Sequence, residues 1–93
     1  MFYDVTRVSA LPNFRLLLTF EDGSQGEFDF ASKVPFSGVF AELRQPDKFA
    51  EVRVNSETGT VEWPTGADLD PIVLYTEVTG KPLGEVLVST AVR

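Results

Sequence analysis

Two aspartates, Asp68 and Asp70, stand two residues apart, and their carboxylates could bind a hard cation such as Ca²⁺ or Mg²⁺ through oxygen. The surrounding residues lack the further carboxylates and the spacing of a calcium loop. Asp70 also precedes Pro71, a common helix start in which the carboxylate caps the helix and proline takes the first position. We therefore expect Asp70 to cap a helix, Asp68 to brace the preceding turn, and neither to bind a metal.

A second carboxylate pair, Glu27 and Asp29, alternates along a predicted strand. Two carboxylates at a suitable separation could cleave a glycoside, but a core of this size leaves little room for a sugar-sized cleft. We expect a solvated acidic sheet face instead, or an acidic surface that steers a basic protein partner. The other acidic residues expected near this face are Glu21, Asp22, Glu51 and Glu62.

Two aromatic residues with a polar group, Trp63 and Tyr75, are expected near one turn, at a strand end and in the first turns of a helix. Such side chains serve as interface contacts or as stacking platforms for bases. The alternative that we favour is a packed corner, in which the indole of Trp63 covers the C-terminal helix. Both residues remain candidates for partner binding.

The composition excludes the commonest catalytic sites within these 93 residues. The sequence contains no histidine and no cysteine, so Ser–His–Asp, Cys–His, the common zinc sites and disulfides are all absent. The glycines form neither a P-loop nor a dinucleotide-binding pattern. Eight basic and fourteen acidic side chains give a net charge of −6, which disfavours direct binding to nucleic acid. We expect a non-enzymatic protein without a cofactor.

The first part of the chain alternates with the period of β-strands, which predicts a meander over residues 3–10, 14–20 and 25–30. Phe14, Leu16 and Leu18 fall on one face of the middle strand. Asp22-Gly23 between two alternating segments is a strong hairpin signal, because glycine accepts a positive φ.

The second part mixes helices with a further hairpin. Apolar residues with helical spacing predict a helix over residues 37–44 that Pro46 stops, and Asp70, Pro71 and Gly80 delimit a helix over residues 71–79. Alternation predicts strands at residues 51–54 and 60–63. The fold class is thus α+β: a single small domain, with an antiparallel sheet of about five strands in two hairpin-rich units and both helices on one face. The predicted core comprises Phe14, Leu16, Leu18, Phe20, Phe28, Phe30, Phe40, Leu43, Phe49, Val54, Val61, Trp63 and Leu74.

The domain is expected to span residues 1–80, followed by a C-terminal extension over residues 81–93. Val86 and Val88 belong to a strand-like alternation whose two faces are both apolar or small. Such a segment needs a partner on both sides or pairs with another chain, which predicts a homodimer through residues 81–93. The candidate partner-binding residues are Trp63, Asp68, Asp70, Tyr75, Val86 and Val88.

One run of residues between positions 14 and 75 is unusually specific, namely Trp63-Pro64-x-Gly66-x-Asp68-Leu69-x-Pro71. It is accompanied by Leu18 to Gly23, Phe28 to Phe30, Phe40 to Leu43, Phe49, Val52 to Val54, and Leu74-Tyr75. In the order of these features, the chain resembles a small prokaryotic family, domain of unknown function 2442. The resemblance implies an α+β domain with no assigned catalytic activity. Some members carry a following helix-turn-helix, for which the thirteen residues 81–93 are too few. Others stand beside a partner protein in arrangements that look like toxin–antitoxin pairs.

These features together predict a protein-interaction or regulatory module, in the manner of the antitoxin member of a two-protein system. The alternative is a transcriptional regulator that associates with nucleic acid through the combined surface of a dimer. No stretch of the sequence reads as a secretory signal or a membrane span, so we expect a cytoplasmic protein.

Overall fold

A meander of three antiparallel strands forms the larger sheet of the computed structural model, which describes residues 3–80. Its strands, in spatial order, are β1 (Val5–Leu11), β2 (Arg15–Phe20) and β3 (Gln25–Asp29). Leu16, Leu18 and Phe20 point to one face and are buried, because successive side chains of a strand alternate. The three strands predicted from the alternation are confirmed.

The two turns of this meander differ in how well the sequence specifies them. Gly23 takes a φ of 90° between β2 and β3, and the side chain of Asp22 accepts the N–H of Ser24 at 2.8 Å, as the Asp-Gly signal predicts. Asn13 and Phe14 both have positive φ, so Phe14 belongs to the β1–β2 turn and not to the strand. A phenylalanine rarely adopts this conformation. Its ring packs edge-on against Phe36 and Phe49, which accounts for its place in the turn.

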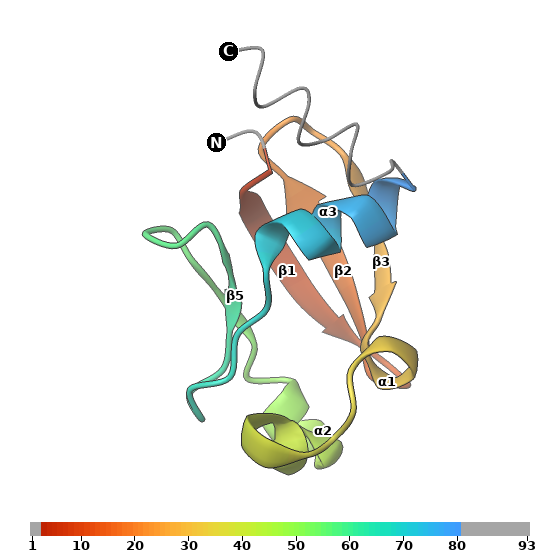
Figure 1. The fold of residues 1–93 in the computed structure, drawn as a ribbon, viewed down its shortest axis with the longest axis vertical. Coiled ribbons are helices and arrows are strands. Elements are labelled where there is room, and N and C mark those ends of the chain that lie inside the picture. Colours follow the sequence, from red (N-terminus) through yellow and green to blue (C-terminus); the bar gives the residue numbers. More distant parts are fainter. Residues whose placement is uncertain (1–2, 81–93) are drawn as a thin grey trace.

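A separate two-stranded sheet stands beside β1 (Figure 1). β4 (Arg53–Asn55) and β5 (Thr60–Glu62) pair with each other and not with the larger sheet. The predicted α+β class is confirmed, but the strands do not form one sheet: among residues 3–80, they divide into sheets of three and two. Between them, the N–H of Val5 donates to the carbonyl of Gly59 at 2.8 Å.

The helix predicted over residues 37–44 is present one residue shorter, as a 3-10 helix, and the structure adds two short α-helices. The described helices are α1 (Phe30–Lys33), the 3-10 helix η1 (Gly38–Arg44), α2 (Pro46–Phe49) and α3 (Pro71–Thr79). α3 has the predicted bounds, whereas α1 and α2 were not predicted, and Pro46 begins a helix instead of only stopping one. η1 has about three residues per turn, so Phe40 and Leu43 face the core while Val39 is 53% exposed.

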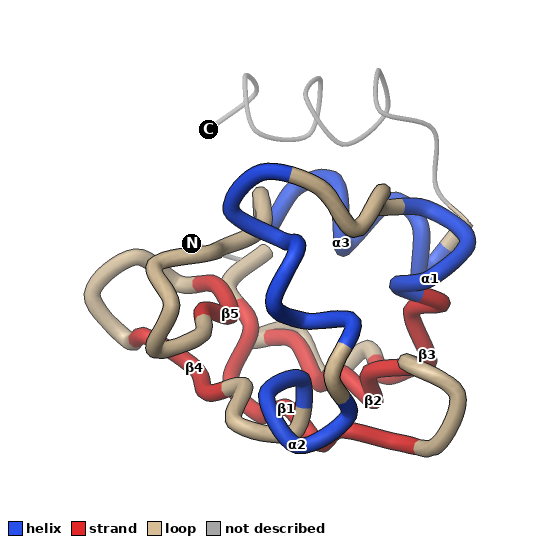
Figure 2. The backbone as a smooth tube through the Cα atoms, turned by 90° about the horizontal axis from the view of Figure 1, so that it is seen from below, coloured by secondary structure: helices blue, strands red, loops and turns tan. Residues whose placement is uncertain are grey.

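The helices cover the larger sheet in part. α3 lies across one of its faces (Figure 1), and Figure 2 shows the strands in one layer with α3 in a second. η1 and α2 lie toward one end of the sheet and not over its middle (Figure 1). α3 approaches β3 closely at Gly26, where an added Cβ would lie 2.7 Å from Cγ1 of Val78. No helix in residues 3–80 has the length and hydropathy needed to cross a bilayer.

The core joins these layers through aromatic rings. The Phe30 ring lies 5.4 Å from Phe49 and 5.5 Å from Trp63, measured between centroids. Phe14, Phe40 and Val54, predicted as core, are only partly buried and pack against it. The buried set also includes four residues outside the predicted core: Tyr3, Val5, Ala67 and Tyr75.

The facing of β2 can be tested by truncating neighbouring leucines. Leu18→Ala should lower the free energy of unfolding by about 2–5 kcal/mol, because Leu18 is fully buried. Leu17→Ala should cost clearly less, because Leu17 lies on the opposite face and is only partly buried. Urea denaturation of both variants measures the difference. Equal losses would contradict the assignment of the faces.

Candidate functional site

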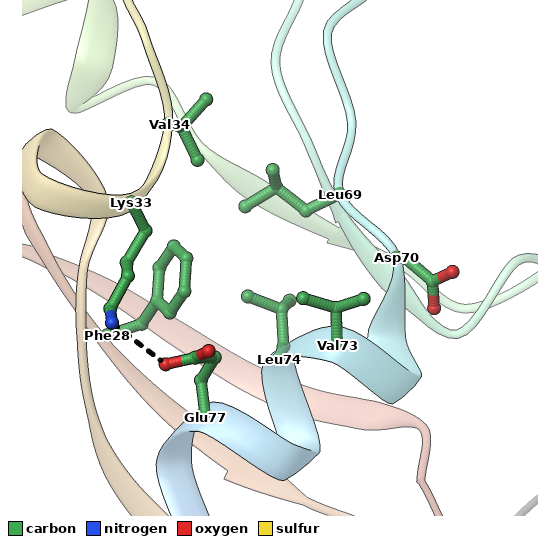
Figure 3. A pocket seen from close by; sticks show the side chains of 8 residues that line it. All are labelled: Phe28, Lys33, Val34, Leu69, Asp70, Val73, Leu74 and Glu77. Atoms are coloured by element: carbon green, nitrogen blue, oxygen red, sulfur yellow. Dashed lines mark ion pairs between the residues drawn. The ribbon is translucent and has the colours of Figure 1, made fainter. Parts of the chain in front are cut away.

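An apolar groove opens between α3, the end of β3 and the end of α1 (Figure 3). Its volume is about 210 Å³. The side chains that line this α3 groove come from four separate parts of the sequence: Phe28, Lys33, Val34, Leu69, Asp70, Val73, Leu74 and Glu77. Small-molecule sites usually enclose roughly 300–1,000 Å³, so the size suits one or two aliphatic side chains better than a cofactor.

The ends of α3 place one wall of the groove. The Asp70 carboxylate accepts the N–H of Ile72 at 2.8 Å, and Pro71 takes the first helical position. Gly80 ends the helix in the left-handed conformation, and its N–H donates to the carbonyl of Thr76 at 2.9 Å. Leu74 is buried at the floor of the groove, whereas Val73 is 49% exposed at its edge.

The charged side chains at the groove already interact with other groups of the same chain. Nζ of Lys33 lies 3.4 Å from Oε2 of Glu77, and both side chains are about half exposed. Such a surface pair contributes at most about 1 kcal/mol, but it joins α1 to α3 at the rim. The Asp70 carboxylate points away from the groove in Figure 3 and caps α3. The interior is therefore apolar, and its chemistry is that of hydrophobic contact.

The two candidate aromatic residues are buried, but the ring contacts of the Trp63 indole are with Phe30 and Phe49 and not with the C-terminal helix that it was expected to cover. Trp63 is 1% exposed, and its Nε1–H donates to the carbonyl of Phe49 at 2.9 Å. Tyr75 is 2% exposed, and its hydroxyl donates to the carboxylate of Asp22. In this conformation neither ring has a face to present to a partner. The indole packs against Phe30 and Phe49.

The other candidate residues lie in different places. Asp70 caps α3, as predicted, and also lines the groove. Asp68 is exposed, and its backbone forms an isolated bridge with Glu62. Within residues 3–80, no three acidic side chains gather as a possible metal site. Val86 and Val88 lie outside the described residues.

The predicted acidic face is interrupted by basic side chains. Nη1 of Arg15 lies 3.4 Å from Oε1 of Glu27, and its Nη2 lies 3.8 Å from Oδ2 of Asp29. Glu62 is on the smaller sheet, where it accepts hydrogen bonds from Asn55 and Arg53. The hydrogen bond from Asn55, which has the larger effect, and the one from Arg53 hold the pKa of the Glu62 carboxyl below its usual range. The acidic residues therefore do not form one continuous patch.

A second hollow of about 310 Å³ lies between the β1–β2 turn and α2. Its lining carries no charged side chain: Ala10, Leu11, Pro12, Asn13, Phe14, Pro46, Phe49 and Ala50. The α3 groove differs in having a charged rim and an exposed aliphatic side chain at its edge. We therefore take the α3 groove as the candidate site.

Most of the groove was missed in the sequence because its lining is scattered along the chain. One signal was present in α3, where four apolar residues, Ile72 to Tyr75, follow one another. A helix that packs on one side against a sheet buries only the side chains along one stripe of its surface. Four consecutive apolar residues extend around more of the helix than this stripe, so one of them remains exposed to solvent. Val73 is that residue.

A comparison with protein-family models matches residues 5–80 to the model described as a protein of unknown function, DUF2442. The matched range contains every residue that lines the α3 groove. Searches of curated proteins and of solved structures give no match.

The capping role of Asp70 predicts a graded series of variants. Asp70→Ala should lower the free energy of unfolding by about 1 kcal/mol, because the N–H of Ile72 loses its acceptor. Asp70→Asn should retain most of that stability, since an amide oxygen also caps. Asp68→Ala serves as the control and should change stability by less than about 0.5 kcal/mol. Thermal denaturation would contradict the assignment if Asp68→Ala were the more damaging variant.

The lowered pKa of Glu62 predicts how stability depends on pH. The carboxylate stabilises the fold above its unfolded pKa, and this contribution is lost as the pH falls through the lower folded pKa. The native chain should therefore exceed Glu62→Gln in stability near neutral pH, and the difference should shrink below about pH 4. Urea denaturation at several pH values measures it. A stability difference that grew as the pH fell would contradict a lowered pKa of Glu62.

Proposed function

Because the chain belongs to the DUF2442 family of proteins of unknown function, we propose its role from the α3 groove: a non-catalytic module that binds another polypeptide. The groove receives an aliphatic side chain from a short segment of the partner. One observation carries the proposal, namely that Val73 is 49% exposed at the edge of a hollow lined by other apolar side chains.

The physical reason is the hydration of apolar surface. Covering apolar area contributes roughly 25 cal/mol for each Å², and a concave surface offers more contact than a flat one. Exposed apolar patches with polar rims are typical of interaction sites. The α3 groove has such a rim in the ion pair of Lys33 and Glu77.

The groups at the groove support binding without catalysis. Glu77 pairs with Lys33, and Asp70 caps α3, so both carboxylates have structural contacts. The sequence supplies no histidine or cysteine that could act beside them. General acid–base chemistry needs a titratable group within hydrogen-bonding reach of the substrate.

Charge favours a partner whose aliphatic segment is flanked by basic residues. The chain carries a net charge of −6, and attraction over the whole surface raises the rate of association with a positive partner. This chemistry suits the regulatory, antitoxin-like member of a two-protein system. The absence of cysteine fits a reducing compartment, and we place the module in the cytoplasm.

The alternative of a nucleic-acid-associated regulator has less support. Arg15, Lys33 and Arg53 all form ion pairs with carboxylates of the same chain. Binding to phosphates would require these pairs to break, which weakens the electrostatic gain.

The proposal is tested with a synthetic peptide, Lys-Val-Leu-Val-Lys, titrated into the full chain while backbone amide shifts are followed by NMR. We expect shifts at Leu69, Val73 and Glu77. Val73→Asp should weaken binding at least about tenfold, because a carboxylate in the groove must be desolvated.

Val39→Asp is the matched control, because Val39 is similarly exposed but lies on η1, outside the groove. It should bind the peptide as the native chain does. Equal weakening by both variants, or no shift at millimolar peptide, would contradict the proposal.

A further inference from the structure

We propose that the α3 groove also receives residues 85–88 of the same chain, so that the C-terminal segment competes with the partner for one surface. This inference rests on the proposed function only in using the same groove. The proposed occupant is the chain's own tail. A second copy of the chain is an outcome that the test distinguishes.

The first support is reach. Val73 lies seven residues before Gly80, which corresponds to about 10 Å along a helix. Residues 81–84 follow directly and include Pro82 and Gly84, which favour a reversal of the chain. Each extended residue beyond them spans about 3.3 Å, so residues 85–88 can return along α3 to the groove.

The second support is chemical complementarity. Val86 and Val88 fall on the same side of an extended segment, and the groove presents Phe28, Leu69 and Val73 to such side chains.

The third support is effective concentration. A segment joined to α3 by a four-residue link is present at its own groove at roughly millimolar effective concentration, higher than a second copy reaches at ordinary protein concentrations. The alternating Val86 to Val92 segment also favours association if it is left uncovered. If the tail docks in the α3 groove of its own chain, part of this segment is covered without formation of a dimer.

Because the sequence contains no cysteine, two introduced cysteines can form only one disulfide within a chain. Val73→Cys combined with Val86→Cys places one thiol at the groove edge and one on the tail, and a disulfide forms where the two Cα atoms approach within about 7 Å. Under mild oxidation of the dilute full chain, we expect an intramolecular bond, read as a monomer that has lost two hydrogens by mass spectrometry.

The matched control pairs Val39→Cys with Val86→Cys, since Val39 and Val73 are similarly exposed. The groove pair should close at least about tenfold faster, as expected from the higher effective concentration of docked thiols. Equal rates would overturn the proposal. A disulfide-linked dimer whose yield rises with protein concentration would overturn it in favour of a second copy.

The variant Val88→Asp tests the same docking without introduced cysteines, which could disturb the fold. Val88→Asp should release the tail and so raise the affinity of the full chain for Lys-Val-Leu-Val-Lys several-fold, because a competitor is removed. If the native chain binds the peptide but Val88→Asp does not change the affinity, self-docking is wrong and the proposed function stands. If the groove disulfide forms but no peptide binds, the proposed function is wrong and self-docking stands.

Discussion

The packing of aromatic rings around Phe30 holds together parts of the chain that no β-ladder joins. Phe30 follows directly on β3, yet its ring contacts Phe49 of α2 and Trp63 beyond β5. The larger and smaller sheets share no ladder in the described part of the chain, so packing against β1, the hydrogen bond from Val5 to Gly59 and these rings join them. Edge-to-face contacts have preferred geometries, and they therefore fix orientation as well as adding buried area.

The same packing sets the geometry of the α3 groove. Because Phe30 is fixed in the core, the short helix that it begins has a fixed direction, and Lys33 and Val34 are held opposite α3. The facing wall is fixed by the cap at Asp70 and by the hydrogen bond from Tyr75 to Asp22. A hollow between two walls that are fixed separately does not have to close on itself, which keeps apolar surface available for binding.

The sequence predicts the elements that local chemistry specifies and misses those that depend on the tertiary structure. α3 and the β2–β3 hairpin have the predicted positions because capping, proline, glycine and Asp-Gly signals act within a few residues. α1 was missed because Phe28 and Phe30 continue the strand alternation, and Pro46 was ambiguous because proline both follows and begins helices. The groove was not predictable, since its walls come from residues 28 to 77 and meet only in the folded chain.

The hydrogen bond between Tyr75 and Asp22 has a consequence for the order of assembly. Its partners are 53 residues apart, whereas each hairpin closes over a few residues. Contacts of low sequence separation form early in folding, and distant ones pay the entropy of loop closure first. We expect the meander to assemble before α3 docks onto it. The α3 groove would then form only on a chain that has finished folding, so the proposed partner would meet its surface only on completed molecules.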